Sequence, residues 1–383
     1  MKLGTTAASV ARLIAERSSV KYTRYREVVL PLSVAEMDYP VAEPVAAAII
    51  DRVKASDFGY IDGPGPLAPA FSLFAEQRWG WRVDPETVHV ATDVSVAIVE
   101  TLRYAIPTGS RVVINPPVYP PFYELVDEAG AERVEVPLRQ GGISWSIDLP
   151  ALEQAFIEGA SAYLLCNPHN PMGLVHSRAT LEEIAKLAAR YNVLVISDEV
   201  HGPLTHPGTV FTPFLAIAEQ FGARAVCVTS ASKGWNLAGT KCAILVAGDA
   251  ESQLVLAGFP EEVACRTSIL GLHVNVAALS SIDWLDGVVA KIVANDELLA
   301  ELIAEHLPGV RYYRPKAGYL GWLDFRPLGL GDDPASSILH YANVALNSGP
   351  TYGEQGRGYA RVNLACEPDT LIEAVLRIEE WVR

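Results

Sequence analysis

Cysteine and methionine are scarce in this chain. Its 383 residues include five cysteines and three methionines, and no two cysteines have the CxxC spacing of redox or metal motifs. Such a sparse, odd-numbered set excludes a disulfide framework and predicts reduced thiols in a cytoplasmic protein. The five positions are Cys166, Cys227, Cys242, Cys265 and Cys366.

Long apolar segments and excess positive charge are also missing. No run of eighteen uncharged apolar residues occurs, so we predict no membrane-spanning helix. Arg12 and Glu16 interrupt the N-terminal segment where a signal peptide needs an apolar core. Lys plus Arg number 30 against 45 Asp plus Glu, a formal charge of −15. This balance argues against nucleic-acid and membrane partners, but a small anionic ligand held by a few local donors is compatible with it.

Metal and dinucleotide motifs are lacking as well. His201 and His206 have no ligand-type spacing to other candidate ligands, and no HExxH sequence occurs. Residues 63–68 (GPGPLA) fit a loose GxGxxA pattern, but no apolar strand precedes them and two prolines interrupt them. We therefore predict neither a metal site nor a dinucleotide site.

The sequence does contain several short apolar runs. Half of the residues are hydrophobic, and the length predicts two or three domains. Six mainly apolar runs lie between helical patterns, as expected for strands of a mainly parallel sheet that is covered on both faces. Thr180 and Glu183 have capping-box spacing and predict the start of a helix between the third and fourth runs. The runs are residues 88–91, 111–114, 162–166, 193–196, 225–228 and 243–246.

The pattern changes after about residue 285. A long helical stretch covers residues 285–306, followed by strand-like residues 319–324 and 359–363 and a final amphipathic helix. The fold class is therefore α/β, with a second, smaller α+β domain towards the C-terminus.

Polar residues follow three of the predicted strands. Residues 166–173 (CNPHNPMG) form an Asn-Pro loop, residues 196–201 (ISDEVH) carry two adjacent carboxylates, and residues 227–233 (CVTSASK) end in a lysine. Each segment alone also fits an ordinary turn or helix cap. Because ligands of parallel sheets bind at the carboxyl ends of the strands, all three can converge on one cleft. An amine, a carboxylate and a hydroxyl cluster are what pyridoxal 5′-phosphate requires.

The order of motifs resembles the fold-type-I pyridoxal-phosphate enzymes of the aminotransferase class I/II superfamily. Within them it is most similar to the branch of cystathionine β-lyases, or C–S lyases, that includes MalY and PatB. The resemblance covers nearly the whole chain. The motifs that carry it are residues 30–38 (LPLSVAEMD), 58–60 (FGY), 115–119 (NPPVY), 167–173 (NPHNPMG), 197–201 (SDEVH), 230–239 (SASKGWNLAG), 319–328 (YLGWLDFRPL), 351–358 (TYGEQGRG) and 361–363 (RVN).

The resemblance implies a fold-type-I transferase fold with a mainly parallel seven-stranded sheet. It implies a large cofactor-binding domain at residues 46–284 and a small domain formed by residues 1–45 and 285–383. It also implies a homodimer in which Tyr60 reaches the phosphate in the neighbouring subunit's site.

The same resemblance assigns roles to individual residues. Lys233 is the lysine that binds the cofactor aldehyde and then moves the substrate α-proton, and Asp198 pairs with the pyridine nitrogen. Tyr119 stacks on the ring and is counted with the catalytic residues. Asn170 and His201 reach the ring oxygen, and Asn170 also serves the substrate with Arg361 and Tyr319. The phosphate is assigned to Val94, Ser95, Ser230, Ser232 and Lys241, and to Tyr60 of a second copy.

Some positions depart from the pattern of the branch. Ser33 stands where tryptophan is usual, Glu36 where aspartate is usual, and Met172 where threonine is usual. These positions are expected near the site, so they bear on the substrate pocket more than on the cofactor. Lys241 has an alternative interpretation as a surface lysine.

The implied activity is α,β-elimination from a small amino acid with a β-thio substituent. L-cystathionine, which yields homocysteine, pyruvate and ammonia in methionine biosynthesis, is the leading substrate. Transamination on the same scaffold is the main alternative, because both reactions begin with loss of the α-proton. A MalY-like role as a binding partner of a regulator is a further alternative.

Overall fold

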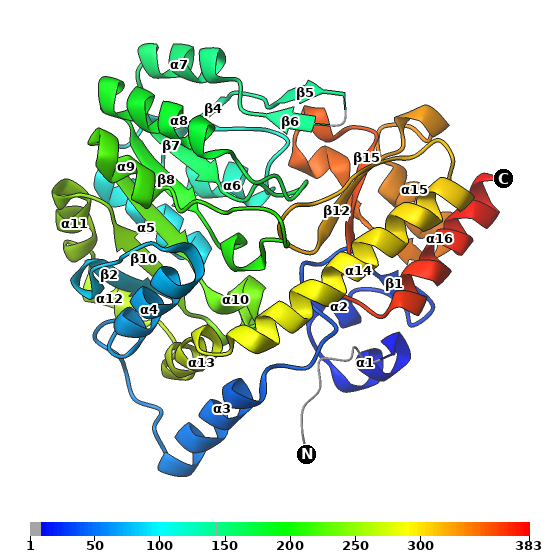
Figure 1. Ribbon diagram of the computed structural model, residues 1–383, viewed down its shortest axis with the longest axis horizontal. Helices are drawn as coiled ribbons and strands as arrows, with labels where there is room; N and C mark the ends of the chain where they lie inside the picture. Colours follow the sequence, from blue (N-terminus) through cyan, green and yellow to red (C-terminus); the bar gives the residue numbers. More distant parts are fainter. Residues whose placement is uncertain (1–8, 143) are drawn as a thin grey trace.

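The computed structural model describes residues 9–142 and 144–383 as two lobes that a long helix connects (Figure 1). This helix, α14 (Ile282–His306), begins against the larger lobe and ends in the smaller one. The boundary expected near residue 285 thus lies in its first turn, and we propose the division at 46–284 on that basis. In the described residues, no helix is long and apolar enough to cross a membrane.

A seven-stranded sheet forms the centre of the large lobe. β10 runs antiparallel to both of its neighbours, and the other contacts between strands are parallel, which confirms the predicted fold class. All six apolar runs are strands. In sheet order the strands are β2 (Val88–Ala91), β10 (Ala243–Ala247), β9 (Ala225–Thr229), β8 (Leu194–Asp198), β7 (Ala160–Cys166), β3 (Arg111–Ile114) and β4 (Glu132–Glu135).

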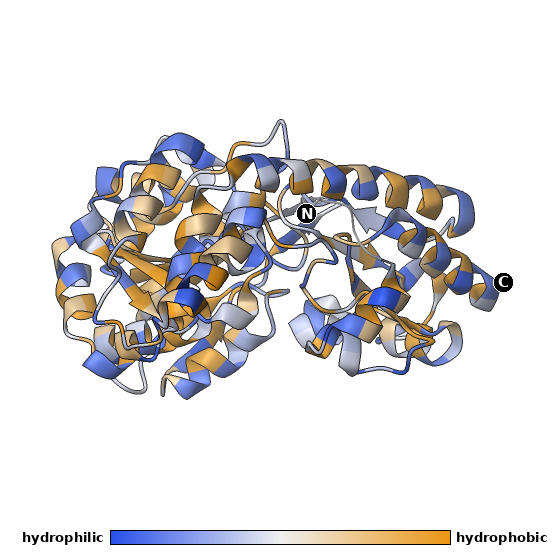
Figure 2. Cartoon of the chain, turned by 90° about the horizontal axis from the view of Figure 1, so that it is seen from below, coloured by the Kyte–Doolittle hydropathy of each residue, from blue (hydrophilic) through white to orange (hydrophobic). Residues whose placement is uncertain are grey.

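Alternate residues of each central strand face two separate apolar layers. Val195 and Cys227 contact the layer of α7, α8 and α9, whereas Ile196 and Val226 contact the layer of α5, α6 and α11. This two-sided burial explains the continuous apolar runs and the hydrophobic interior in Figure 2. The helices are α5 (Val94–Ala105), α6 (Pro121–Glu128), α7 (Leu149–Ile157), α8 (Arg178–Tyr191), α9 (Leu215–Phe221), α11 (Ala250–Ala257) and α12 (Glu261–Cys265).

The predicted start of α8 was wrong by one turn. Ser177, rather than Thr180, is the N-cap residue, and its hydroxyl oxygen accepts the Thr180 N–H at 3.1 Å. Glu183 pairs instead with the Lys186 ammonium on the exposed face of the helix. Ser177 and Thr180 can both cap a helix, and they lie three positions apart. Ser177 comes first and has an extended backbone, so the helix begins directly after it.

The small lobe combines a four-stranded antiparallel sheet with helices from both ends of the chain. β1 (Leu30–Pro31) pairs in parallel with β13 (Val344–Ala345), so the N-terminal segment lies against the C-terminal third. This pairing supports our proposed assignment of the N-terminal segment to the small domain over residues 9–45, and residues 1–8 of that assignment lie outside the described residues. The other elements are β11 (Arg311–Tyr313), β12 (Leu320–Asp324), β15 (Tyr359–Asn363), β14 (Asn347–Ser348), α1 (Val10–Glu16), α2 (Val20–Thr23), α15 (Pro334–Ala342) and α16 (Pro368–Val382).

The remaining helices flank the large lobe. α13 (Ile269–Leu279) packs against both α3 (Glu43–Ala55) and α4 (Leu67–Trp79). A short helix, α10 (Ala231–Gly234), follows β9. A hairpin of β5 (Arg139–Gly141) and β6 (Ser144–Ser146) extends towards the small lobe.

Candidate active site

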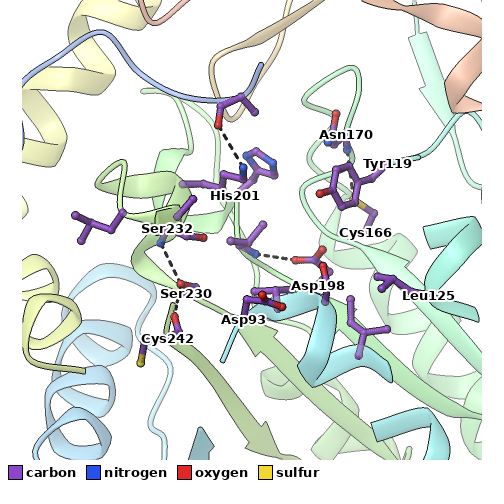
Figure 3. A pocket seen from close by; sticks show the side chains of 18 of the residues that line it. Asp93, Tyr119, Leu125, Cys166, Asn170, Asp198, His201, Ser230, Ser232 and Cys242 are labelled. Carbon is purple, nitrogen blue, oxygen red and sulfur yellow. Dashed lines mark hydrogen bonds between the residues drawn. The ribbon is translucent and has the colours of Figure 1, made fainter. Parts of the chain in front are cut away.

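A cavity of about 180 Å³ lies at the carboxyl ends of the parallel strands (Figure 3). It contains most of the residues that the sequence assigned to the site, although they come from five separate segments of the chain. The predicted residues that line it are Val94, Ser95, Tyr119, Asn170, Asp198, His201, Ser230, Ser232, Lys233 and Lys241. Tyr60, Tyr319 and Arg361 do not line it.

The two adjacent carboxylates at the end of β8 face opposite sides of the sheet. Asp198 follows the alternation of Ile196 and lies in the cavity, where its Oδ1 accepts the Val200 N–H at 3.1 Å. Burial raises the pKa of Asp198 to about 6, and the Val200 N–H and the Lys233 ammonium oppose that shift. Neither carboxylate belongs to a solvated turn, because both are buried.

Glu199 faces the apolar layer on the other side. Its Oε1 accepts the Ser197 hydroxyl at 2.8 Å and the Phe214 N–H at 2.7 Å. Burial nevertheless raises the pKa of Glu199 to about 7. Asp198 is therefore the carboxylate available to a ligand, and Glu199 stabilises the loop around Phe214.

Glu199→Gln should change how stability depends on pH. In the folded protein the pKa of Glu199 lies above its ordinary value of 4.5. The contribution of Glu199 to the free energy of unfolding is therefore fully present below pH 4.5, and it is lost as pH rises to about 7. Glutamine keeps the acceptor oxygen but has no proton to lose. Relative to wild type, we expect the variant to gain about 3 kcal/mol in free energy of unfolding between pH 4.5 and 8. Urea unfolding at both values tests this, and a constant difference would contradict it.

Lys233 is placed by the turn between β9 and α10. Ser230 caps α10 by accepting the Ser232 N–H at 3.0 Å, and its hydroxyl donates to the Cys242 carbonyl at 2.7 Å. The Lys233 Nζ donates to the Ala35 carbonyl at 3.3 Å. Burial, together with the positive charge of Arg361, lowers the pKa of Lys233 to about 8, while Asp198 raises it. A fraction of this amine is therefore neutral, and hence nucleophilic, near neutral pH.

Arg361 and Asn170 join the two lobes beside the cavity. The Arg361 Nη1 donates to the Asn170 Oδ1 at 2.9 Å, and Nη2 donates to the Ser33 carbonyl at 3.2 Å. Arg361 is buried, and its Nε has no hydrogen-bond partner in the described part of the chain. A buried guanidinium with an unused donor and no carboxylate partner is suited to binding an anion.

Residues 33–37 form a bent segment beside the site, and Ala35 lines the cavity. The Ala35 carbonyl accepts both Lys233 Nζ and the Tyr319 hydroxyl, the latter at 3.0 Å. The Asn363 side-chain amide donates to the Val34 and Glu36 carbonyls at 2.7 Å each. Tyr319, predicted to serve the substrate, is thus occupied in holding this segment and lies outside the cavity lining.

The three departures from the branch pattern lie in different surroundings, and the buried Ser33 hydroxyl has no hydrogen-bond partner among the described residues. Ser33 is buried beside Arg361, and the Glu36 Oε1 accepts the Ser19 hydroxyl at 2.8 Å. Met172 is buried in the core. Asn236, which the sequence analysis did not single out, bonds to both the N–H and the carbonyl of Met37 at 2.9 Å.

His201 is a neutral side chain at the edge of the cavity. Burial, with the charges of Lys233 and Arg361, lowers its pKa to about 3. Its ring lies edge-on to Tyr319, with 6.4 Å between centroids, and its Nδ1 has no hydrogen-bond partner among the described residues. A neutral imidazole with a free nitrogen can bond to an oxygen of a bound ring.

The predicted phosphate ligands gather at one end of the cavity. Val94 and Ser95 begin α5, Ser230 and Ser232 begin α10, and Lys241 follows β9 and α10 in the chain. The start of a helix offers free N–H groups and a favourable dipole to an anion. Lys241 lines the cavity although its side chain is 54% exposed, so its assignment to the phosphate stays a prediction.

The residues present fit pyridoxal 5′-phosphate. A lysine with a lowered pKa, a buried aspartate with one protein donor, and a helix start with flanking hydroxyls share one cavity. Tyr60 is 92% exposed, and its assignment to a second copy stays a prediction. Among the described residues, no cluster of three metal-ligating side chains occurs.

Comparison with known proteins identifies the family. A family model described as "Aminotransferase class I and II" matches residues 27–378. The chain therefore belongs to this family, as the motifs predicted.

Individual relatives are similar over nearly the full length. A Mycobacterium leprae protein named "Putative cystathionine beta-lyase" is 43% identical, with 94% of each chain covered. "Cystathionine beta-lyase PatB" of Bacillus subtilis is 31% identical, with 94% of this chain and 96% of the relative covered. A crystal structure of a "putative plp-dependent beta-cystathionase" from Corynebacterium diphtheriae superimposes with a TM-score of 0.92 at 33% identity, covering 99% of both chains.

Proposed function

We propose that this protein is a pyridoxal-phosphate-dependent carbon–sulfur β-lyase. It cleaves L-cystathionine or a related cysteine S-conjugate to a thiol, pyruvate and ammonia. The observation that carries the proposal is the convergence of Lys233, Asp198 and Asn170 on one cavity, with Arg361 bonded to Asn170 beside it. Relatives named as cystathionine β-lyases support the substrate class.

When bound, pyridoxal phosphate supplies an electron-withdrawing ring that stabilises negative charge on the substrate α-carbon. Asp198 holds a proton on the ring nitrogen, and the Val200 N–H keeps the carboxylate in place. His201 and Asn170 would hold the ring through its oxygen, and Tyr119 would contact the ring from the wall of the cavity. The low pKa of His201 keeps this group neutral, so it adds no charge beside Arg361.

Lys233 moves the proton that starts the reaction. Its neutral amine takes the substrate α-proton, and its lowered pKa makes that form available near neutral pH. The Ala35 carbonyl, steadied by Tyr319, holds the Nζ atom at the edge of the cavity. The β-thiolate then leaves, and the released aminoacrylate hydrolyses to pyruvate and ammonia.

Arg361 binds the substrate α-carboxylate together with Asn170. Arg361→Lys removes the planar fork, so we expect KM for L-cystathionine to rise by about a hundredfold. The cofactor should still bind, because Arg361 does not line the cavity. Arg357→Lys is the matched control, since Arg357 is exposed and pairs with Asp332 and Glu354. An equal rise in KM for both variants would contradict the assignment.

The site is completed by a second copy of the chain in this proposal. Tyr60 lies in the segment between α3 and α4, away from its own cavity and 92% exposed, as expected for a residue that serves a neighbouring subunit. We also propose a cytoplasmic enzyme, which agrees with five free cysteines.

The direct test is pyruvate release from L-cystathionine, cysteine and a panel of S-substituted cysteines. We expect stoichiometric pyruvate and thiol with no keto-acid requirement. Absence of turnover with every β-thio amino acid would contradict the proposal. Amino transfer that depends on an added keto acid would instead support the transaminase alternative.

A further inference from the structure

Asp93 places a carboxylate inside the group of residues assigned to the phosphate. It caps α5, where its Oδ1 accepts the Val96 N–H at 2.9 Å. Its Oδ2 accepts the Lys241 ammonium at 3.0 Å. Asp93 lines the same cavity as Val94, Ser95 and Lys241. The sequence analysis did not single it out, and the proposed mechanism does not use it.

This arrangement opposes the binding of a phosphate. A phosphate ester carries about −1.5 to −2 charges at pH 7. The charged side chains of the cavity are Asp93, Asp198, Lys233 and Lys241, and Lys241 is the cation that lies at the phosphate end. Asp93 already pairs with that cation, so an arriving phosphate must share Lys241 with a neighbouring carboxylate.

Solvent limits the size of this effect. The side chains of Asp93 and Lys241 are 33% and 54% exposed, so their interaction with each other and with a phosphate is screened. A moderate change in affinity is expected rather than loss of binding. The capping hydrogen bond is independent of charge, because asparagine caps helices as well as aspartate does.

We propose that Asp93 weakens cofactor binding by holding Lys241 and by adding negative charge beside the phosphate. Asp93 thus sets how readily the enzyme releases and regains its cofactor, separately from the chemistry at Lys233. The inference rests on the proposed pyridoxal-phosphate site.

Asp93→Asn tests the inference, because it removes the charge and keeps the cap. The full-length chain, freed of cofactor, is titrated with pyridoxal 5′-phosphate, and binding is followed by cofactor absorbance and tryptophan fluorescence. We expect the affinity to rise by about fivefold or more over wild type. Pyridoxal, which lacks the phosphate, should bind both proteins equally. Lys241→Met should weaken the affinity for the phosphorylated form only.

Asp249 offers a matched control. It caps α11 with nearly the same backbone geometry, φ −157° and ψ 167° against −158° and 172° for Asp93, and it does not line the cavity. Asp249→Asn should leave cofactor affinity unchanged. Unchanged or weaker affinity of Asp93→Asn for pyridoxal 5′-phosphate, or an equal gain in affinity for pyridoxal, would overturn the role of Asp93. Neither result would affect the proposed function. Failure of wild type to bind pyridoxal phosphate would overturn both this role and the proposed function.

Discussion

Replacing Lys233 with alanine is expected to lower kcat for pyruvate release from L-cystathionine by about 10⁴-fold or more. The half-buried amine is the group in the cavity with a pKa near 8 that can both bind an aldehyde and accept an α-proton. Alanine removes both capacities. The cofactor absorbance of the purified variant should also differ from wild type, because the covalent link to the protein is lost.

Lys186→Ala is the control for Lys233→Ala. Lys186 lies on the exposed face of α8 and pairs with Glu183, so its removal should leave kcat and the spectrum as in wild type. Circular dichroism of both variants checks that the fold is retained. Substantial pyruvate release from Lys233→Ala at wild-type rates would show that another group performs the proton transfer.

Asp198→Asn should lower kcat by about a hundredfold or more while the cofactor still binds. Asparagine has nearly the same shape as aspartate and can still accept the Val200 N–H, but it cannot hold a positive charge on the ring nitrogen. The ring then withdraws electrons less strongly, and the α-proton becomes harder to remove. Steady-state kinetics and an absorbance titration of the cofactor measure the two effects separately.

Glu199→Gln is the control for Asp198→Asn. It also removes the charge of a buried carboxylate, but at a position that faces away from the cavity. Both carboxylates are buried and both have raised pKa values, but Glu199 faces Phe214 on the other side of the sheet. Its variant should keep near-wild-type kcat at pH 8. If the two variants lost activity equally, the assignment of Asp198 to the cofactor would fail.

The strands of the large lobe were predictable because burial on both faces leaves an unmistakable apolar run. β4 was missed for the opposite reason: Glu132–Glu135 is an edge strand whose side chains are mostly exposed, and its sequence resembles a polar loop. The alternation along β8 also determined which of Asp198 and Glu199 enters the cavity, whereas the sequence analysis chose Asp198 from the family resemblance alone.

The site was predictable where a motif follows a strand, as at Asn170, Asp198 and Lys233. The Ala35 carbonyl had no such signal, because a backbone acceptor leaves no mark in the residue type. Asp93 could have been found, since it lies two residues after the predicted strand at residues 88–91. A single aspartate before a helix, however, is usually only a cap.

The central claim is that Lys233 binds the aldehyde of pyridoxal phosphate. Borohydride reduction of the holoenzyme makes that link permanent, and peptide mass spectrometry then locates it. We expect a phosphopyridoxyl group on Lys233, and on no other lysine in stoichiometric amount. A label on a different lysine, or none on a protein that retains the cofactor, would contradict it.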